Sequence, residues 1–244
     1  MKVKILAHTP NPERVIALAG KLCYSPVGID ELNDKVSDEE VNKFISKLTN
    51  MGHMSPFEHV YFTFAIEGIS RNCSHQIVRH RVASYSQQSQ RYVKMNGEYI
   101  LPLSIAQDDE LALKYNRALD YADTVYRELT ESLITNKIEE RYPNRLPIKE
   151  WIKTHQKEYK AIEKEAIEDA RYILPSACTT KMEFTMNVRE LLHFFKQRCC
   201  KRAQWEIRAL ANEMLKQCKE VSPLLFKNAG APCSTCTEGE LKCK

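Results

Sequence analysis

Residues 79–91 constrain this chain more than any other stretch of its sequence. They read Arg-His-Arg-Val-Ala-Ser-Tyr-Ser-Gln-Gln-Ser-Gln-Arg, a run of arginines, serines and amides with few apolar side chains. Arginines are costly to bury without charged partners, and the stretch contains no acidic residue. Guanidinium, hydroxyl and amide groups together suit phosphates and the hydrogen-bonding edge of a planar heterocycle. The stretch therefore predicts a binding loop for an anionic, nucleotide-like ligand, although an irregular polar surface loop can have a similar composition.

The rest of the sequence is typical of an ordinary globular protein. Of its 244 residues, 43% are hydrophobic and 28% are charged, which is enough for a real core. The net charge of +4 is too mild for a protein that coats nucleic acid. No run approaches the roughly 18 apolar residues of a membrane span, and the N-terminus lacks a hydrophobic signal region. We therefore expect a cytoplasmic protein with neither a membrane nor a nucleic-acid partner.

Local patterns predict an α+β chain in which helices predominate. Alternating apolar residues at 1–7 and a β-rich run at 60–66, ending at Gly68, predict strands, and a further strand is expected at 184–187. Ser37–Glu40 has the pattern of a capping box. Amphipathic spacing predicts helices over residues 11–24, 69–79, 108–135, 148–172, 188–198 and 205–219. We expect a helix-rich subunit around a small, mostly antiparallel sheet.

Several catalytic classes are excluded by motif. The chain has seven glycines and no glycine-rich phosphate loop, zinc-protease helix or nucleophile elbow. Its nine cysteines are expected to be reduced thiols. Cys233, Cys236 and Cys243 have the spacing of part of a zinc site, but no fourth ligand is adjacent. We expect no metal and a thiol-bearing tail.

Two further polar clusters accompany residues 79–91. One is His53–His59. The other lies on the predicted helix 188–198, where Arg189, His193 and Arg198 fall near one side. Asn187, just before this helix, is placed to cap its start. Together these clusters favour one binding site, and the residues alone predict a protein that binds a phosphorylated planar ligand.

The three clusters resemble the motifs of one enzyme family. Residues 79–91 are similar to the signature of the flavin-dependent thymidylate synthases, with two of its serines at Ser84 and Ser89. His53–His59 resembles the upstream motif of that family. Residues 171–175, the helix 188–198 and Ala203–Glu206 resemble the C-terminal half of its active site. The resemblance spans residues 1–226, which we expect to form a single domain, with residues 227–244 as a cysteine-containing tail.

The resemblance implies a fold, a reaction and an assembly. The enzymes of this family are methyltransferases that convert dUMP to dTMP by reductive methylation. FAD carries the hydride, 5,10-methylenetetrahydrofolate supplies the carbon, NADPH reduces the flavin, and tetrahydrofolate is released. The resemblance also implies a homotetramer of α+β subunits in which the active sites are shared between subunits.

The resemblance assigns roles residue by residue. The positions that match flavin contacts are Ser55, Arg79, His80, Arg81, Gln87, Asn187, Arg189 and His193. The positions that match dUMP contacts are Gln76, Arg79, Ser89, Gln90, Arg91, Arg171 and Arg198. Arg198 matches the catalytic arginine near N3 of the uracil ring, where a fixed cation stabilises negative charge on the ring. His53 is a candidate for the folate step.

Gln87 departs from the family pattern, because members often carry a glutamate there. An amide keeps an acceptor and adds a donor but removes a charge. One alternative is therefore a catalytically inactive member of the family. Another is a non-catalytic RNA- or nucleotide-binding module that uses the same arginines, which predicts base-stacking aromatic residues and a broader basic patch.

Overall fold

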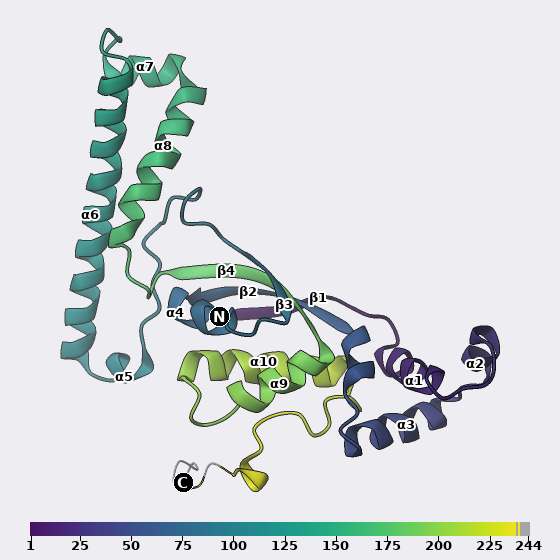
Figure 1. Ribbon diagram of the computed structural model, residues 1–244. Coiled ribbons are helices and arrows are strands. Elements are labelled where there is room, and N and C mark those ends of the chain that lie inside the picture. The colour runs from purple at the N-terminus through teal and green to yellow at the C-terminus, as the bar shows by residue number, and fades with distance from the viewer. Residues whose placement is uncertain (238, 240–244) are drawn as a thin grey trace. The chain divides into compact units, whose positions relative to one another are not determined.

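The chain folds into two compact units, seen in the computed structural model in Figure 1, which describes residues 1–237 and 239. The sheet unit comprises Met1–Ile69, Cys73–Ser86 and the chain from Lys181 onward. The hairpin unit comprises Ser70–Asn72 and Gln87–Thr180. Short ends of several sheet-unit elements belong to the hairpin unit.

The sheet unit contains the strands and the helices that cover them. Its elements are β1 (Lys2–His8), α1 (Pro12–Leu22), α2 (Ile29–Lys35), α3 (Asp38–Asn50), η1 (Ser55–His59), β2 (Tyr61–Ser70), α4 (Arg71–Ile77), β3 (Ala83–Gln87), β4 (Thr179–Asn187), α9 (Val188–Arg198), α10 (Trp205–Val221) and η3 (Cys233–Thr235). The hairpin unit contributes α5 (Leu103–Ala106), α6 (Asp109–Arg141), α7 (Ile148–Thr154), α8 (Gln156–Ala170) and η2 (Arg171–Ile173).

The four strands form one sheet in the order β1-β2-β4-β3. β1 and β2 are antiparallel, with Lys2 opposite Glu67 and His8 opposite Phe62. Alternation along β2 places Phe62 and Phe64 in the core, because successive strand residues face opposite sides of a sheet. The expected fold class, helix-rich around a small antiparallel sheet, is confirmed.

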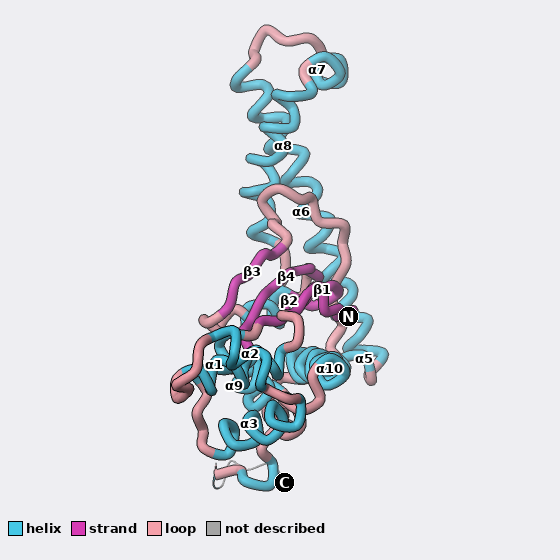
Figure 2. The backbone as a smooth tube through the Cα atoms, turned by 90° about the vertical axis from the view of Figure 1, so that its right-hand side faces the viewer, coloured by secondary structure: helices cyan, strands magenta, loops and turns pink. Residues whose placement is uncertain are grey.

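Helices α9 and α10 lie against one face of the sheet (Figure 2). Their apolar sides join Phe62, Phe64 and Phe184 in a single core. The Phe64 and Phe184 rings stack with centroids 5.6 Å apart. The side chain of Gln217 on α10 also accepts from the Ile5 amide and donates to the Val3 carbonyl of β1, at 3.1 and 3.0 Å. The position of α9 on this core fixes the polar residues at its two ends.

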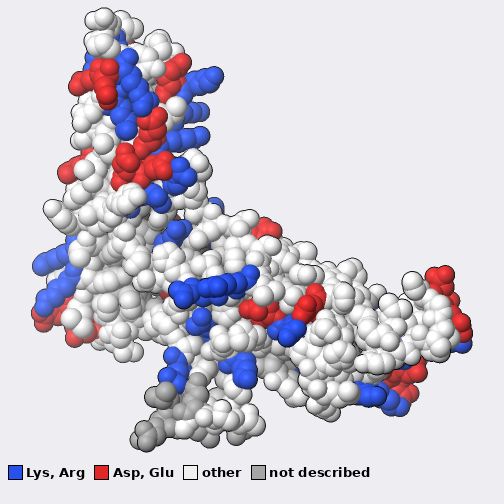
Figure 3. All heavy atoms as spheres, in the orientation of Figure 1, with Lys and Arg blue, Asp and Glu red and all other residues white. Residues whose placement is uncertain are grey.

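The hairpin unit is built on the 33-residue helix α6, against which α8 packs. Asp108 caps α6 by accepting from the amides of Glu110 and Leu111. A second, smaller core includes Ile138 and Trp151. Acidic and basic side chains are interspersed along the surface of this unit (Figure 3). None of the helices in the described part of the chain is long and apolar enough to cross a membrane.

Several predicted elements are confirmed and others are corrected. The capping box at Ser37 is present, with Ser37 and Glu40 bonded reciprocally. Gly68 does not end β2, because its φ of +71° lets the strand bend and continue to Ser70. The predicted helix 148–172 is wrong as a single element, since the backbone of His155 leaves the helical region and separates α7 from α8. The predicted loop 79–91 contains a strand, β3.

Candidate active site

Helix α9 begins and ends with residues of the predicted site. Asn187, the last residue of β4, is buried and caps the helix, because its Oδ1 accepts from the Glu190 amide at 2.8 Å. The predicted cap is therefore confirmed. The Val188 amide donates to the Val60 carbonyl at 2.8 Å and holds the junction between strand and helix. Arg198 is the last residue of the helix.

The imidazole of His80 connects the two ends of α9. His80 follows α4 and is only 5% exposed. Its Nδ1 lies 3.0 Å from Oε1 of Glu190, and the Nε of Arg198 donates to its Nε2 at 3.0 Å. Its ring also meets the Phe194 ring edge to face, with centroids 4.9 Å apart. Glu190, His80 and Arg198 therefore form a connected polar triad within the sheet unit.

The triad fixes the protonation of His80. Burial lowers the pKa of His80 below its ordinary value, and the charge on Arg198 acts in the same direction, while Glu190 opposes both. The imidazole is therefore neutral at pH 7. Because Arg198 donates to Nε2, that nitrogen carries no proton, and the remaining proton lies on Nδ1 and is donated to Glu190.

Strand β3 also supports His80, through the side chain of Tyr85. The hydroxyl of Tyr85 donates to the carbonyls of His80 and Ile77, at 2.6 and 2.9 Å. Its ring packs against Phe184 of β4, with centroids 5.9 Å apart. The backbone of the turn that carries Arg79, His80 and Arg81 is thus tied to the sheet, while the side chains of the two arginines are exposed.

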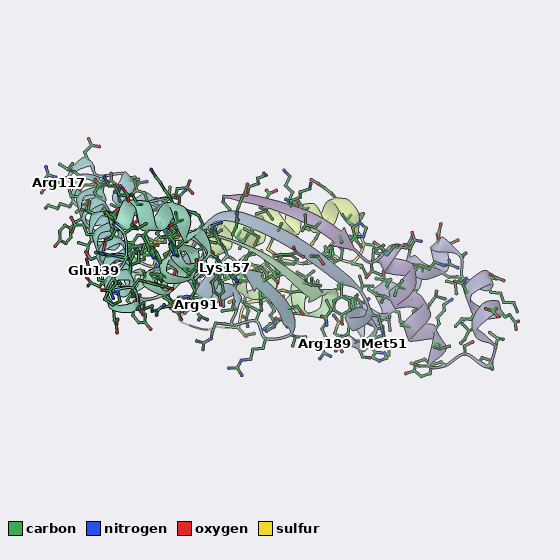
Figure 4. All side chains as sticks on the ribbon, turned by 90° about the horizontal axis from the view of Figure 1, so that it is seen from above. Met51, Arg91, Arg117, Glu139, Lys157 and Arg189 are labelled. Atoms are coloured by element: carbon green, nitrogen blue, oxygen red, sulfur yellow. The ribbon has the colours of Figure 1, made fainter. Side chains whose placement is uncertain are left out.

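A second group of predicted residues lies at η1. Ser55 is the first residue of η1, and its hydroxyl lies 3.1 Å from Nε2 of His53. Arg189, in the first turn of α9, forms an ion pair with Glu58 of η1. Figure 4 shows Arg189 on the same edge of the sheet unit as Met51, which precedes η1. His53, Ser55 and Arg189 therefore lie within the sheet unit, close to η1.

The hairpin unit holds another set of predicted residues around Glu168. The carboxylate of Glu168 forms an ion pair with Arg91. The backbone carbonyl of Glu168 accepts from Nε of Arg171 at 3.1 Å. Ser89 accepts from the Arg91 amide at 3.1 Å. Burial lowers the pKa of Arg71, a residue that the sequence did not single out, and the nearby charge of Arg171 lowers it further. Arg91 and Arg171 thus both contact Glu168, and Arg71 lies near Arg171.

The predicted site residues are divided between the two units. Those in the sheet unit are Ser55, Gln76, Arg79, His80, Arg81, Asn187, Arg189, His193 and Arg198. Those in the hairpin unit are Gln87, Ser89, Gln90, Arg91 and Arg171. The amide of Gln87 donates to the Thr180 hydroxyl at 3.2 Å, a bond that a glutamate could make only by accepting.

Sequence reasoning missed Glu190, Glu168, Arg71 and Tyr85. Glu190 had one local signal, its place three residues after the cap Asn187. That position predicts only a favourable charge near a helix N-terminus. Its contact with His80 spans 110 residues of sequence, and no local pattern reports it.

A pocket of about 600 Å³ lies at the C-terminal end of α9. Arg198 lines it together with residues of the tail, including Cys233 and Cys236. Within residues 1–237 and 239, no group of three or more histidine, cysteine or acidic side chains is placed to hold a metal ion. Cys243 lies outside the described residues.

Comparison with known proteins identifies the family. The family model described as "Thymidylate synthase complementing protein" matches residues 4–224. A flavin-dependent thymidylate synthase of Clostridium tetani is 51% identical over 246 residues, covering 100% of this chain and 93% of that protein. One from Geobacter sulfurreducens is 45% identical over 248 residues, covering 100% and 94%.

A solved structure shares the fold. The UMP/dUMP methylase PolB from Streptomyces cacaoi, bound with 5-Br dUMP, superimposes with a TM-score of 0.71 at 18% identity and 93% coverage of both chains. At that identity the likeness concerns the fold alone. The family model and the two relatives, in contrast, match nearly the whole chain and confirm the resemblance found at residues 79–91. The chain therefore belongs to the family of flavin-dependent thymidylate synthases.

Proposed function

We propose that this protein converts dUMP to dTMP by reductive methylation. In the proposed reaction 5,10-methylenetetrahydrofolate provides the carbon, NADPH is the reductant, and tetrahydrofolate is released. FAD, when bound, supplies the hydride that the pyrimidine receives. The observation that carries the proposal is the guanidinium of Arg198, held at the end of α9 by a buried and uncharged imidazole, in a chain of this family.

The residues proposed for the flavin fit such a group. Arg79 and Arg81 present exposed guanidinium groups on either side of buried His80, and guanidinium forks match the two phosphates of FAD. Asn187 and His80 are both buried and both bound to α9, Asn187 as its cap and His80 through Glu190 and Arg198. Their proposed role is therefore to shape the site. Ser55, Gln87, Arg189 and His193 complete the proposed flavin contacts.

The residues proposed for dUMP fall into two chemical groups. Arg91 and Arg171, with Ser89, carry the cations and hydroxyl that suit a phosphate. Gln76 and Gln90 carry amides that suit the uracil edge, and Arg79 is proposed to contact the nucleotide as well as the flavin. Arg198 is proposed to stabilise negative charge that develops on the ring, because its cation is fixed before the reaction begins.

The proposed assembly is a cytoplasmic homotetramer with shared sites. Exposed arginines such as Arg79 and Arg81 would then find their counter-charges on ligands bound between neighbouring copies. Sedimentation of the purified protein tests the assembly, since a monomer at working concentration would contradict it.

The activity is tested with purified protein and defined components. We expect the visible bands of oxidised flavin, a change in those bands when dUMP is added, and dTMP formation only when dUMP, methylenetetrahydrofolate and NADPH are all present. Leaving out each component in turn identifies its role. A colourless protein that FAD does not reconstitute would overturn the proposal.

A further inference from the structure

Glu190 occupies a position that the reaction by itself does not explain. It lies in the first turn of α9, eight residues before Arg198, so about 12 Å of helix separates the two residues. The His80 imidazole bridges this gap by contacting both side chains at 3.0 Å. The Glu190 side chain is only 13% exposed, and a carboxylate is seldom buried to that extent without a specific partner.

The hydrogen-bonding chemistry of His80 makes Glu190 necessary to the triad. A guanidinium N–H can only donate, so Nε2 of His80 must accept and the proton must lie on Nδ1. A buried Nδ1–H without an acceptor is costly. Without Glu190, a shift of the proton from Nδ1 to Nε2 would remove that cost. Nε2–H and the Nε–H of Arg198 would then both be donors, and the hydrogen bond to Arg198 would be lost. Only an acceptor at Nδ1 keeps the imidazole in the form that holds Arg198.

We propose that Glu190 is a positioning residue for Arg198, acting through the tautomer of His80. Glu190 does not touch the substrate; it fixes which nitrogen of His80 is protonated, and the imidazole in turn holds the Nε of Arg198. The two terminal nitrogens of the guanidinium are then presented in one orientation. The inference rests on the proposed function in one respect, that Arg198 is the group that meets the pyrimidine.

A simpler role for Glu190 is to stabilise α9 through its charge near the helix N-terminus. The chain contains a matched control for that role. Glu40 occupies the same third helical position in α3, after the cap Ser37, and lies far along the chain from His80. Glu40→Ala and Glu190→Ala remove the same charge from the same helical position, and only the second removes the acceptor for His80.

The kinetic test compares Glu190→Ala, Glu190→Gln and Glu40→Ala in the flavin-loaded enzyme. We expect Glu190→Ala to lower kcat by about tenfold or more while the KM for dUMP changes much less. Glu190→Gln keeps an oxygen that accepts from Nδ1, so its kcat should lie between those of Glu190→Ala and the wild type. Glu40→Ala should keep the wild-type kcat. Equal kcat values for Glu190→Ala and Glu40→Ala would overturn the proposal, as would a Gln variant slower than the Ala variant.

The pH profile gives a second readout that a purely structural role would not move. The groups facing His80 are Glu190, Arg198 and His193 of α9 and the hydroxyl of Tyr85 of β3. Glu190 raises the pKa of His80, so its removal lowers that pKa further. The acid limb of the kcat profile should therefore move to lower pH in Glu190→Gln. An unchanged limb, together with an unchanged kcat, would contradict the proposal.

A spectroscopic test separates this inference from the proposed function. In protein labelled with ¹⁵N-histidine, the His80 ring should show a protonated Nδ1 and an unprotonated Nε2, with the resonances assigned by their loss in His80→Gln. Glu190→Ala should shift this ring toward the other tautomer or a mixture. These spectra need no substrate, so they hold even if no dTMP is formed. An unshifted ring in Glu190→Ala would overturn the inference and leave the proposed function standing.

Discussion

Arg91 and Glu168 form a two-point ion pair within the hairpin unit. Nε of Arg91 lies 2.7 Å from Oε1 of Glu168, and a terminal nitrogen of the same guanidinium donates to Oε2 at 3.0 Å. The pair raises the pKa of Arg91 above its ordinary value. A carboxylate bound in this way occupies the same fork of donors that a phosphate would use. The nucleotide would therefore have to displace Glu168 or share Arg91 with it.

Glu168→Gln should strengthen dUMP binding. The amide keeps the size of the side chain but competes less for the guanidinium, so the Kd for dUMP should fall by about twofold to fivefold. Calorimetric titration with dUMP measures this change. Glu165→Gln is the matched control, because Glu165 lies on the same helix, is equally exposed and pairs with Arg141. Weaker binding in Glu168→Gln would show that Glu168 holds Arg91 in place and does not compete with the ligand.

Arg91→Ala should weaken dUMP binding without removing the flavin. Loss of one charge-assisted contact to a phosphate should raise the Kd for dUMP by about tenfold or more. The same titration with deoxyuridine, which lacks the phosphate, should show little difference between variant and wild type. An unchanged Kd for dUMP would remove Arg91 from the phosphate site.

Arg198→Ala should leave FAD bound and greatly reduce dTMP formation. A fixed cation at a site of developing charge contributes about 100-fold to 1000-fold in kcat when removed singly. Flavin absorbance and product formation measured on the same sample distinguish binding from turnover. Arg127→Ala, which removes an exposed arginine paired with Asp123 on α6, serves as the control. Normal turnover in Arg198→Ala would refute the role assigned to this residue.

The stability of the sheet unit should fall in acid because of His80. Burial holds the folded-state pKa of His80 below the ordinary value of about 6.5. Between the two pKa values the unfolded chain binds more protons, so the free energy of unfolding rises with pH in this window. The contribution is complete above the unfolded-state pKa and is lost as the pH falls through the folded-state pKa. Urea unfolding at pH 7.5 and at acid pH measures it, and the difference should shrink in His80→Gln.

Tyr85→Phe should destabilise the turn that carries His80. The substitution removes the hydroxyl that donates to the His80 and Ile77 carbonyls but keeps the ring against Phe184. We expect the free energy of unfolding to fall by about 1–2 kcal/mol. Tyr172→Phe, at a tyrosine that is 84% exposed, should change it little. Equal stability of the Tyr85 variant and the wild type would show that these bonds add nothing to the fold.

Some features of the fold and site follow from short stretches of sequence. The cap at Asn187, the capping box at Ser37 and the apolar spacing of α9 depend on residues within one or two helical turns, and all three were predictable. The motif at residues 79–91 identified the family for the same reason, because its spacing is itself a local property. The break at His155 was not predictable, since the apolar pattern continues across it and only the non-helical backbone of this residue separates α7 from α8.

The sequence by itself thus determined the family, the fold class and the set of polar residues for the proposed site. The tertiary structure decided how those residues are connected. Glu190 and Arg198 meet His80 across 110 and 118 residues of chain, and Arg91 meets Glu168 across 77. Such pairings form only when separate elements pack together, and the burial that follows sets the protonation of His80. Local pattern contains neither the pairing nor the burial, which is why Glu190 and Glu168 were found only in the folded chain.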